Sequence, residues 1–144
     1  MKTIYAILII SFLFQFNTNA QWEQQTAPSL NDNLNSVYFI RNLIGYAVGE
    51  HGRILTTSNA GGYWLVQNSP TTNDLNSIYF IEFMGWAVGT EGTIIKTTDG
   101  GNNWNIIYSG ISTDLRDVFF IDVNNGWAVG DDGIIFRTTN GGNN

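Results

Sequence analysis

The sequence predicts an all-β fold, namely a β-propeller made of four-stranded antiparallel blades, and three observations lead to it. One segment occurs three times at a spacing of about forty residues, at 45–61, 85–101 and 126–142. Each copy consists of short runs of β-branched and aromatic residues that Gly- and Asn-rich turns separate. No helical periodicity occurs after residue 20. Four short strands in such a repeat are typical of one propeller blade, whereas the alternative fold, a β-sandwich, needs no repeated sequence.

Residues 1–20 are interpreted as a secretory signal peptide. Lys2 precedes an apolar run over 4–16, and Thr18 and Ala20 place small residues at the −3 and −1 positions of a cleavage site. The alternative, a membrane anchor, is disfavoured because the run is shorter than the roughly 20 residues that a spanning helix needs. We therefore expect no membrane span after cleavage, and a secreted, periplasmic or cell-surface protein.

The charge and the cysteine content exclude several classes of function. The chain carries 6 Lys and Arg against 12 Asp and Glu, so its formal charge is −6, and it becomes one unit more negative when Lys2 leaves with the leader. Such a chain has no basic surface for nucleic acid. It contains no cysteine, which excludes disulfides and thiolate metal sites. No metal and no cofactor are expected.

The mature chain, residues 21–144, is expected to form a partial propeller with repeats at about 22–64, 65–104 and 105–144. Each repeat contains a run that ends in four apolar residues, which fits a strand buried on both faces. These first strands cover 34–40, 75–81 and 115–121. Second strands are expected at 46–48, 86–88 and 127–129, and third strands at 53–57, 93–97 and 134–138.

Fourth strands are expected directly after Trp64 and Trp104. Trp22 holds the same place in the repeat, because a Leu follows each of the three tryptophans after 11 or 12 residues. The mature chain is therefore expected to begin with the last strand of a blade. The second and third strands are joined by Gly-x-x-Gly at 49–52, 89–92 and 130–133, which predicts tight hairpins in which Gly supplies any positive φ.

A second turn carries the pattern Ser/Thr-x-Asp-x-Gly-x-x-Trp, with Asn in place of Asp in two copies. The motif residues are Thr57, Asn59, Gly61 and Trp64, then Thr97, Asp99, Gly101 and Trp104, then Thr138, Asn140 and Gly142. This motif resembles the Asp-box, or bacterial neuraminidase repeat. Together with Gly-Trp-Ala-Val-Gly-x-x-Gly, it makes residues 22–144 similar to the propellers related to the photosystem II stability and assembly factor.

The Asp-box is expected to have a structural role. The side-chain oxygen of Asp99 accepts hydrogen bonds from backbone N–H groups of its own turn, and Thr97 adds a hydroxyl. Trp104 folds back over the hairpin and buries a large apolar area. The alternative roles, a catalytic carboxylate or a calcium ligand, are disfavoured because Asn59 and Asn140 replace the acid.

The resemblance implies two classes of function. Kinship with the assembly factor implies a non-catalytic exported module that binds a protein, or alternatively a glycan, and that docks photosystem subunits if the kinship is close. Asp-boxes also occur in sialidases, so a glycoside hydrolase is the alternative. That family uses a cluster of three arginines, whereas Arg41, Arg53, Arg116 and Arg137 occupy different places in the repeat. We therefore expect no catalytic residues in this chain.

Topology predicts a candidate binding rim. In a four-stranded meander, the turn between the second and third strands lies on the same side as the connection to the next blade. This side is expected to carry Glu50, His51, Glu91, Asp131 and Asp132, together with the loops 68–74 and 109–114. An acidic face of this kind fits a cationic protein segment, and the alternative is that it serves solubility alone.

About three blades are fewer than the four to eight of a typical propeller ring. We therefore expect ring closure by blades downstream of residue 144, or by self-association of two or more copies.

Overall fold

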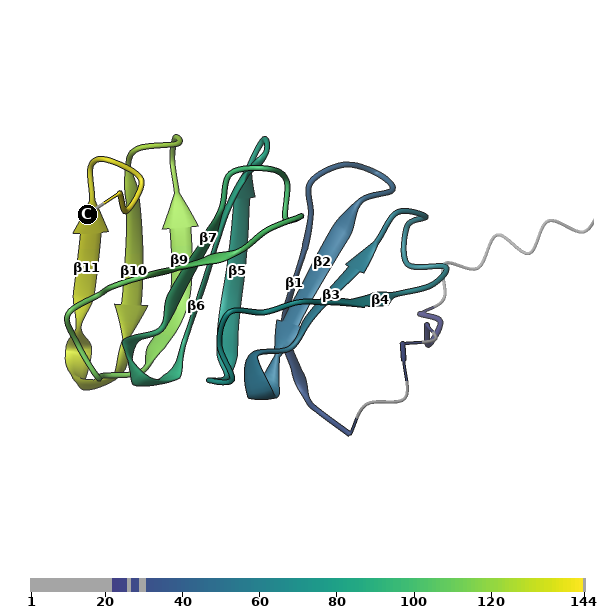
Figure 1. Cartoon of the computed structure of the whole chain (residues 1–144), viewed down its shortest axis with the longest axis horizontal. Helices are drawn as coiled ribbons and strands as arrows, with labels where there is room; N and C mark the ends of the chain where they lie inside the picture. Colours follow the sequence, from purple (N-terminus) through teal and green to yellow (C-terminus); the bar gives the residue numbers. More distant parts are fainter. Residues whose placement is uncertain (1–21, 26, 29–30, 144) are drawn as a thin grey trace, which may run out of the picture.

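The structure, a computed structural model, describes residues 22–25, 27–28 and 31–143. The predicted signal peptide, residues 1–20, lies outside the described residues. Figure 1 shows three antiparallel sheets side by side in a row. Blade 1 comprises β1 (Leu34–Phe39), β2 (Gly45–Gly49), β3 (Ile54–Thr57) and β4 (Leu65–Gln67). Blade 2 comprises β5 (Leu75–Ile81), β6 (Met84–Gly89), β7 (Ile94–Thr97) and β8 (Asn105–Ile107). Blade 3 comprises β9 (Leu115–Phe120), β10 (Gly126–Gly130) and β11 (Ile135–Thr138).

The predicted fold class is confirmed. Each blade is a meander in which the strands pair in chain order, and the described residues place four strands in each of blades 1 and 2 and three in blade 3. The strands begin and end within a few residues of the predicted limits because each run of apolar residues stops at a Gly-, Asn- or Asp-rich turn. Single 3-10 turns follow the second strands, at η1 (Glu50–Gly52), η2 (Thr90–Gly92) and η3 (Asp131–Gly133).

The predicted strand after Trp22 is wrong for the described residues. Residues 22–25 are not extended in any sheet, and the Trp22 side chain is fully exposed. A fourth strand needs a third strand to pair with, and in this chain β3 and β7 already pair with β4 and β8. The remaining third strand, β11, lies at the other end of the row, away from residues 22–25 (Figure 1).

The core lies between the blades rather than within one sheet. Between blades 1 and 2, Tyr46 and Ile54 pack against Phe80 and Trp104. Between blades 2 and 3, Trp86 of blade 2 packs against Phe120 of blade 3. Blade 2 lies between blades 1 and 3, so β6 is buried on both faces, whereas β1 and β11 of the two end blades are largely exposed.

The Gly-x-x-Gly turns differ from the prediction in where the positive φ lies. The first glycine is extended, with φ −166° at Gly89, whereas the third turn residue, Glu91, has φ 54° and Gly92 has φ 63°. Glycine is required at position 89 for space, because a Cβ there would lie 1.8 Å from the carbonyl oxygen of Asp74. The turn is thus pressed against the residues that precede the first strand of its own blade.

Candidate binding rim and the Asp-box turns

The three 3-10 turns lie at one end of the strands, on the side that we call the turn rim. In each blade the first turn residue donates its backbone N–H to a carbonyl just before the first strand, with N···O distances of 2.9 to 3.0 Å. The pairs are Glu50 with Asn33, Thr90 with Asp74, and Asp131 with Asp114. The turn rim therefore brings together the five predicted rim residues and the residues that precede β1, β5 and β9.

Two further bonds join the turns of neighbouring blades. The backbone N–H of His51 donates to Asp74 Oδ1 at 2.8 Å, and that of Glu91 donates to Asp114 Oδ1 at 2.9 Å. In both cases a turn with positive φ points its N–H at a carboxylate of the next blade. Asp74 and Asp114 therefore connect adjacent blades, a role that the sequence analysis missed. Their shared position just before a first strand was the signal that could have revealed it.

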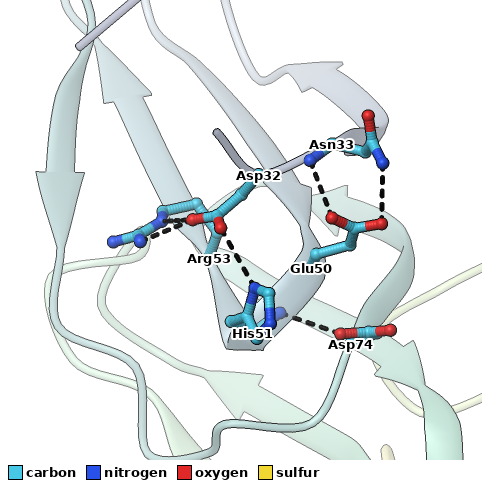
Figure 2. A network of polar contacts seen from close by, with 6 residues as sticks. All are labelled: Asp32, Asn33, Glu50, His51, Arg53 and Asp74. Carbon is cyan, nitrogen blue, oxygen red and sulfur yellow. Dashed lines mark hydrogen bonds and ion pairs between the residues drawn. The ribbon is translucent and has the colours of Figure 1, made fainter. Parts of the chain in front are cut away.

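Figure 2 shows the polar network of blade 1 on the turn rim. Arg53 donates Nε and Nη2 to Asp32 Oδ2 at 2.9 and 2.6 Å, and His51 Nδ1 lies 3.0 Å from Asp32 Oδ1. Glu50 accepts hydrogen bonds from the backbone and the side-chain amide of Asn33. The pKa of Asp32 lies below its usual value, chiefly because the Arg53 guanidinium binds its ionised form. Asn33 lowers the pKa of Glu50 in the same way.

In blade 3, Asp131 holds the position that Glu50 holds in blade 1, and it is paired with an arginine. Arg116 donates Nε and Nη2 to Asp131 at 2.8 and 2.6 Å, and Nη2 lies 3.3 Å from Asp114. The Arg116 guanidinium accordingly holds the pKa of Asp131 below its usual value. Arg116 occupies the position of Asn35 and Asn76, whose amides donate across the blade interface to Leu75 and Leu115 carbonyls.

The carboxylates of the turn rim therefore differ in whether another side chain of the protein already binds them. Carboxylates outnumber the two arginines there, and the acidic residues are Asp32, Glu50, Asp74, Glu91, Asp114, Asp131 and Asp132. Ion pairs hold Asp32 and Asp131, and Asn33 holds Glu50. Glu91 and Asp132 are exposed and form no ion pair with a described residue.

The Asp-box turns lie at the opposite end of the strands. Thr97 Oγ1 accepts the N–H of Gly101 at 2.9 Å, and Asp99 Oδ1 accepts the N–H of Asn103 at 2.9 Å. Hydrogen bonds to Asn103 and Thr97 hold the pKa of Asp99 at about 2, and the side-chain amide of Asn103 makes the largest contribution. Thr57 and Asn59 form the same bonds in the first copy. In the third copy Thr138 Oγ1 accepts the N–H of Gly142, and Asn140 Oδ1 accepts the N–H of Asn143, three residues later.

Each of the last two Asp-boxes also binds the blade before it. Tyr46 donates its hydroxyl to the Gly100 carbonyl, and Trp86 donates Nε1 to the Gly141 carbonyl at 3.0 Å. Trp104 packs back against Tyr46 and is 7% exposed, whereas Trp64 is half-buried beside Phe39. These turns therefore position neighbouring blades.

The four arginines do not gather into a substrate-binding cluster among the described residues. Arg53 and Arg116 pair with carboxylates of their own blades, while Arg41 lies over the Phe83 ring at 5.2 Å and Arg137 over the Trp127 ring at 5.7 Å. Within the described residues, no group of three or more His, Cys, Asp or Glu side chains could hold a metal ion. No helix in the described part is long and apolar enough to cross a membrane.

Comparison with known proteins places this fold in a family. The model of the family described as photosynthesis system II assembly factor YCF48 matches residues 14–112. The chain belongs to this family. The family match confirms the predicted resemblance to the photosystem II assembly-factor propellers. A search of the curated proteins found no match.

Three solved structures have a similar fold. YCF48 from Cyanidioschyzon merolae has a TM-score of 0.73 at 25% identity, over 84% of this chain and 38% of that one. YCF48 bound to D1 peptide has a TM-score of 0.72 at 24% identity, over 78% of this chain and 39% of that one. An ancestral GH74 enzyme has a TM-score of 0.65 at 18% identity, over 82% of this chain and 19% of that one, and shows the fold alone. This chain thus spans less than half the length of each structure.

Proposed function

We propose that this chain is part of an exported, non-catalytic propeller that binds a cationic segment of a partner protein at its turn rim. The observation that carries the proposal is that Glu91 and Asp132 are exposed and form no ion pair with a described residue, on a rim where carboxylates outnumber arginines. It is supported by membership of the assembly-factor family and by the similar YCF48 structure, which is described as bound to a peptide.

Glu91 and Asp132 are the contact residues in this proposal. They hold the same position in the turns of blades 2 and 3, and both side chains are exposed. Both residues have positive φ and lie in turns at the ends of the blades. Charge complementarity at such a rim speeds association and favours Lys- or Arg-rich segments over acidic ones.

A non-catalytic role is supported by how the polar side chains are used. His51 is the one histidine of the chain, and its exposed ring lies beside Asp32, which Arg53 also binds. The arginines that a sialidase would need together are separate, and each meets a different carboxylate or aromatic ring. His51, Arg53 and Arg116 of the described rim thus hold neighbouring segments of the chain together.

The proposal is tested with fluorescently labelled Lys- and Arg-rich peptides and with matched peptides in which Glu replaces these residues. Binding of the basic set should weaken steeply with salt, because exposed charges are screened over about 10 Å at 0.1 M ionic strength. The double variant Glu91→Gln/Asp132→Asn should weaken binding further. The control is Glu82→Gln/Asp122→Asn, which removes two charges on the Asp-box side. Equal binding of both peptide sets, or equal effects of the two double variants, would contradict the proposal.

Two other outcomes would replace it. Turnover of fluorogenic sialosides that persists through purification and is lost when a rim carboxylate is mutated would establish an enzyme. Binding to immobilised glycans that the Glu91→Gln/Asp132→Asn variant abolishes would establish a glycan partner in place of a protein.

A further inference from the structure

A cavity of about 210 Å³ lies between blades 1 and 2 on the Asp-box side. Its lining comes from the β1–β2 turn, the β5–β6 turn and the Asp-box of blade 2, and it includes Arg41, Tyr46, Phe83, Asp99 and Asn102. All of the lining residues belong to blades 1 and 2, and each of these blades has four strands in the described structure. The cavity is smaller than the roughly 300–1,000 Å³ of pockets that hold drug-sized ligands, so it suits a smaller molecule.

The equivalent place between blades 2 and 3 is occupied by the ammonium group of Lys96. Lys96 lies directly opposite Trp86 in the pairing of β6 with β7. Its Nζ lies 5.7 Å from the centre of the Trp86 ring and donates to Asn143 Oδ1 of the next blade at 2.7 Å. An aromatic ring and an amide oxygen thus hold a primary ammonium group at this point of the repeat.

Between blades 1 and 2 the ring and the amide are present, but the lysine is not. Tyr46 holds the position of Trp86, and the residue opposite it is Thr56, whose side chain is too short to reach the next blade as a lysine does. Asn102 holds the position of Asn143, and its Oδ1 accepts no hydrogen bond from a described residue. The replacement of a lysine by Thr56 therefore leaves an ammonium position without an ammonium group of the protein.

Two charged side chains further distinguish this cavity from the equivalent place in the next interface. Asp99 stands where the box of blade 3 has an asparagine, and the Asn103 amide and other groups of its turn hold the pKa of Asp99 at about 2, so it is ionised at neutral pH. Arg41 stands where blade 2 has Glu82, and its guanidinium lies over the Phe83 ring and forms no ion pair with a described residue. The cavity therefore offers a carboxylate to a bound ammonium group and a guanidinium to a bound carboxylate.

We propose that this cavity binds a free apolar α-amino acid, with its ammonium group over the Tyr46 ring and its carboxylate on Arg41. The ammonium group takes the place that Lys96 fills one blade further along the chain. Ile40 and Ile44 also line the cavity and provide an apolar surface for the side chain of the ligand. Because the ligand carries one charge of each sign, its binding should change little with salt, unlike the binding of a basic peptide at the turn rim.

Titration calorimetry of the full chain with three related ligands tests this proposal. Leucine carries both charged groups, leucinamide lacks the carboxylate, and N-acetylleucine lacks the ammonium group. Each of the two analogues should bind roughly tenfold or more weakly than leucine, because each loses one set of charge-assisted hydrogen bonds.

Three variants assign the two ends of the ligand. Arg41→Gln should weaken leucine binding roughly tenfold or more and should not weaken leucinamide binding. Asp99→Asn should weaken the binding of leucine and leucinamide but not of N-acetylleucine, and the turn is kept because Asn59 forms the same bonds in blade 1. Thr56→Lys should abolish leucine binding, because it supplies an ammonium group of the protein at the ammonium position.

The control is Arg137→Gln, which removes the arginine over the Trp127 ring of blade 3 and should leave leucine binding unchanged. A chain that does not bind leucine, or one that binds leucinamide or N-acetylleucine as tightly as leucine, would overturn the proposal. Equal effects of Arg41→Gln and Arg137→Gln, or leucine binding that persists in Thr56→Lys, would also overturn it. These results are independent of whether the turn rim binds a basic peptide.

Discussion

At the scale of single residues, the Asp-box shows how one side-chain oxygen organises a turn. Asp99 and Asn59 both accept the hydroxyl of the Thr two residues earlier and the backbone N–H four residues later. The acid forms one further bond, from the Asn103 amide to its second oxygen at 2.7 Å. The carboxylate therefore strengthens a turn that an amide can also form.

This difference predicts a pH effect at Asp99. Its pKa is lowered from 3.8 to about 2 in the folded protein, so the ionised carboxylate stabilises the fold above the unfolded pKa. That stabilisation is lost as the pH falls from about 4 through about 2. The denaturant midpoint should therefore drop more in the native chain than in Asp99→Asn over this range, as followed by Trp fluorescence. Parallel curves for the two proteins would contradict this explanation.

The tryptophans predict a second contrast. Trp104→Ala should cost about 3–5 kcal/mol, because it removes a ring buried between two blades. Trp104→Phe should be milder, since Trp104 Nε1 is buried with no hydrogen-bond partner in the described structure.

The control for this contrast is Trp86→Phe, which deletes the bond to the Gly141 carbonyl and should cost about 1–3 kcal/mol more than Trp104→Phe. Urea denaturation of the three variants measures the difference. Equal losses for Trp86→Phe and Trp104→Phe would show that the bond to Gly141 contributes nothing.

At the scale of the elements, the glycines of the Gly-x-x-Gly turns are required as much for the space around them as for their torsion angles. Gly89→Ala would place a Cβ 1.8 Å from the Asp74 carbonyl oxygen, and relieving this clash should cost about 3 kcal/mol or more. Gly133→Ala meets nothing within 4 Å and suffers only from its φ of 71°, so about 1–2 kcal/mol is expected. Thermal denaturation of both variants compares them. If Gly133→Ala were the more damaging change, torsional preference would dominate.

At the scale of the whole molecule, export is a prediction from residues 1–20, which lie outside the described residues, so experiment has to test it. The basic start, the apolar run and the cleavage site predict removal of residues 1–20. Expression with an intact secretion pathway should give a protein that begins at Gln21 and is found outside the cytoplasm, as N-terminal sequencing and cell fractionation would show. Ala20→Arg should block cleavage and leave a longer protein. A protein that starts at Met1 and stays in the cytoplasm would contradict the prediction.

What the sequence determined was local and repeated. The alternation of apolar runs with Gly-rich turns defined the eleven strands of the described chain and the three box turns, because strand and turn preferences act over a few neighbouring residues. The same repeat placed Glu50, Glu91 and Asp131 on one side of the blades. The strand after Trp22 was predicted wrongly because a repeat shows which residues are equivalent but not whether a partner strand is within reach.

What only the tertiary structure decided was which distant residues meet within a blade and across neighbouring blades. The pairing of Asp32 with Arg53 and of Asp131 with Arg116 leaves Glu91 and Asp132 as the exposed carboxylates without an ion pair in the described rim. The contact of His51 with Asp74 and the cavity beside Tyr46 likewise depend on how the blades pack. The physical reason is that these contacts join residues about 15 to 55 positions apart in the chain, where the local pattern carries no information on distance.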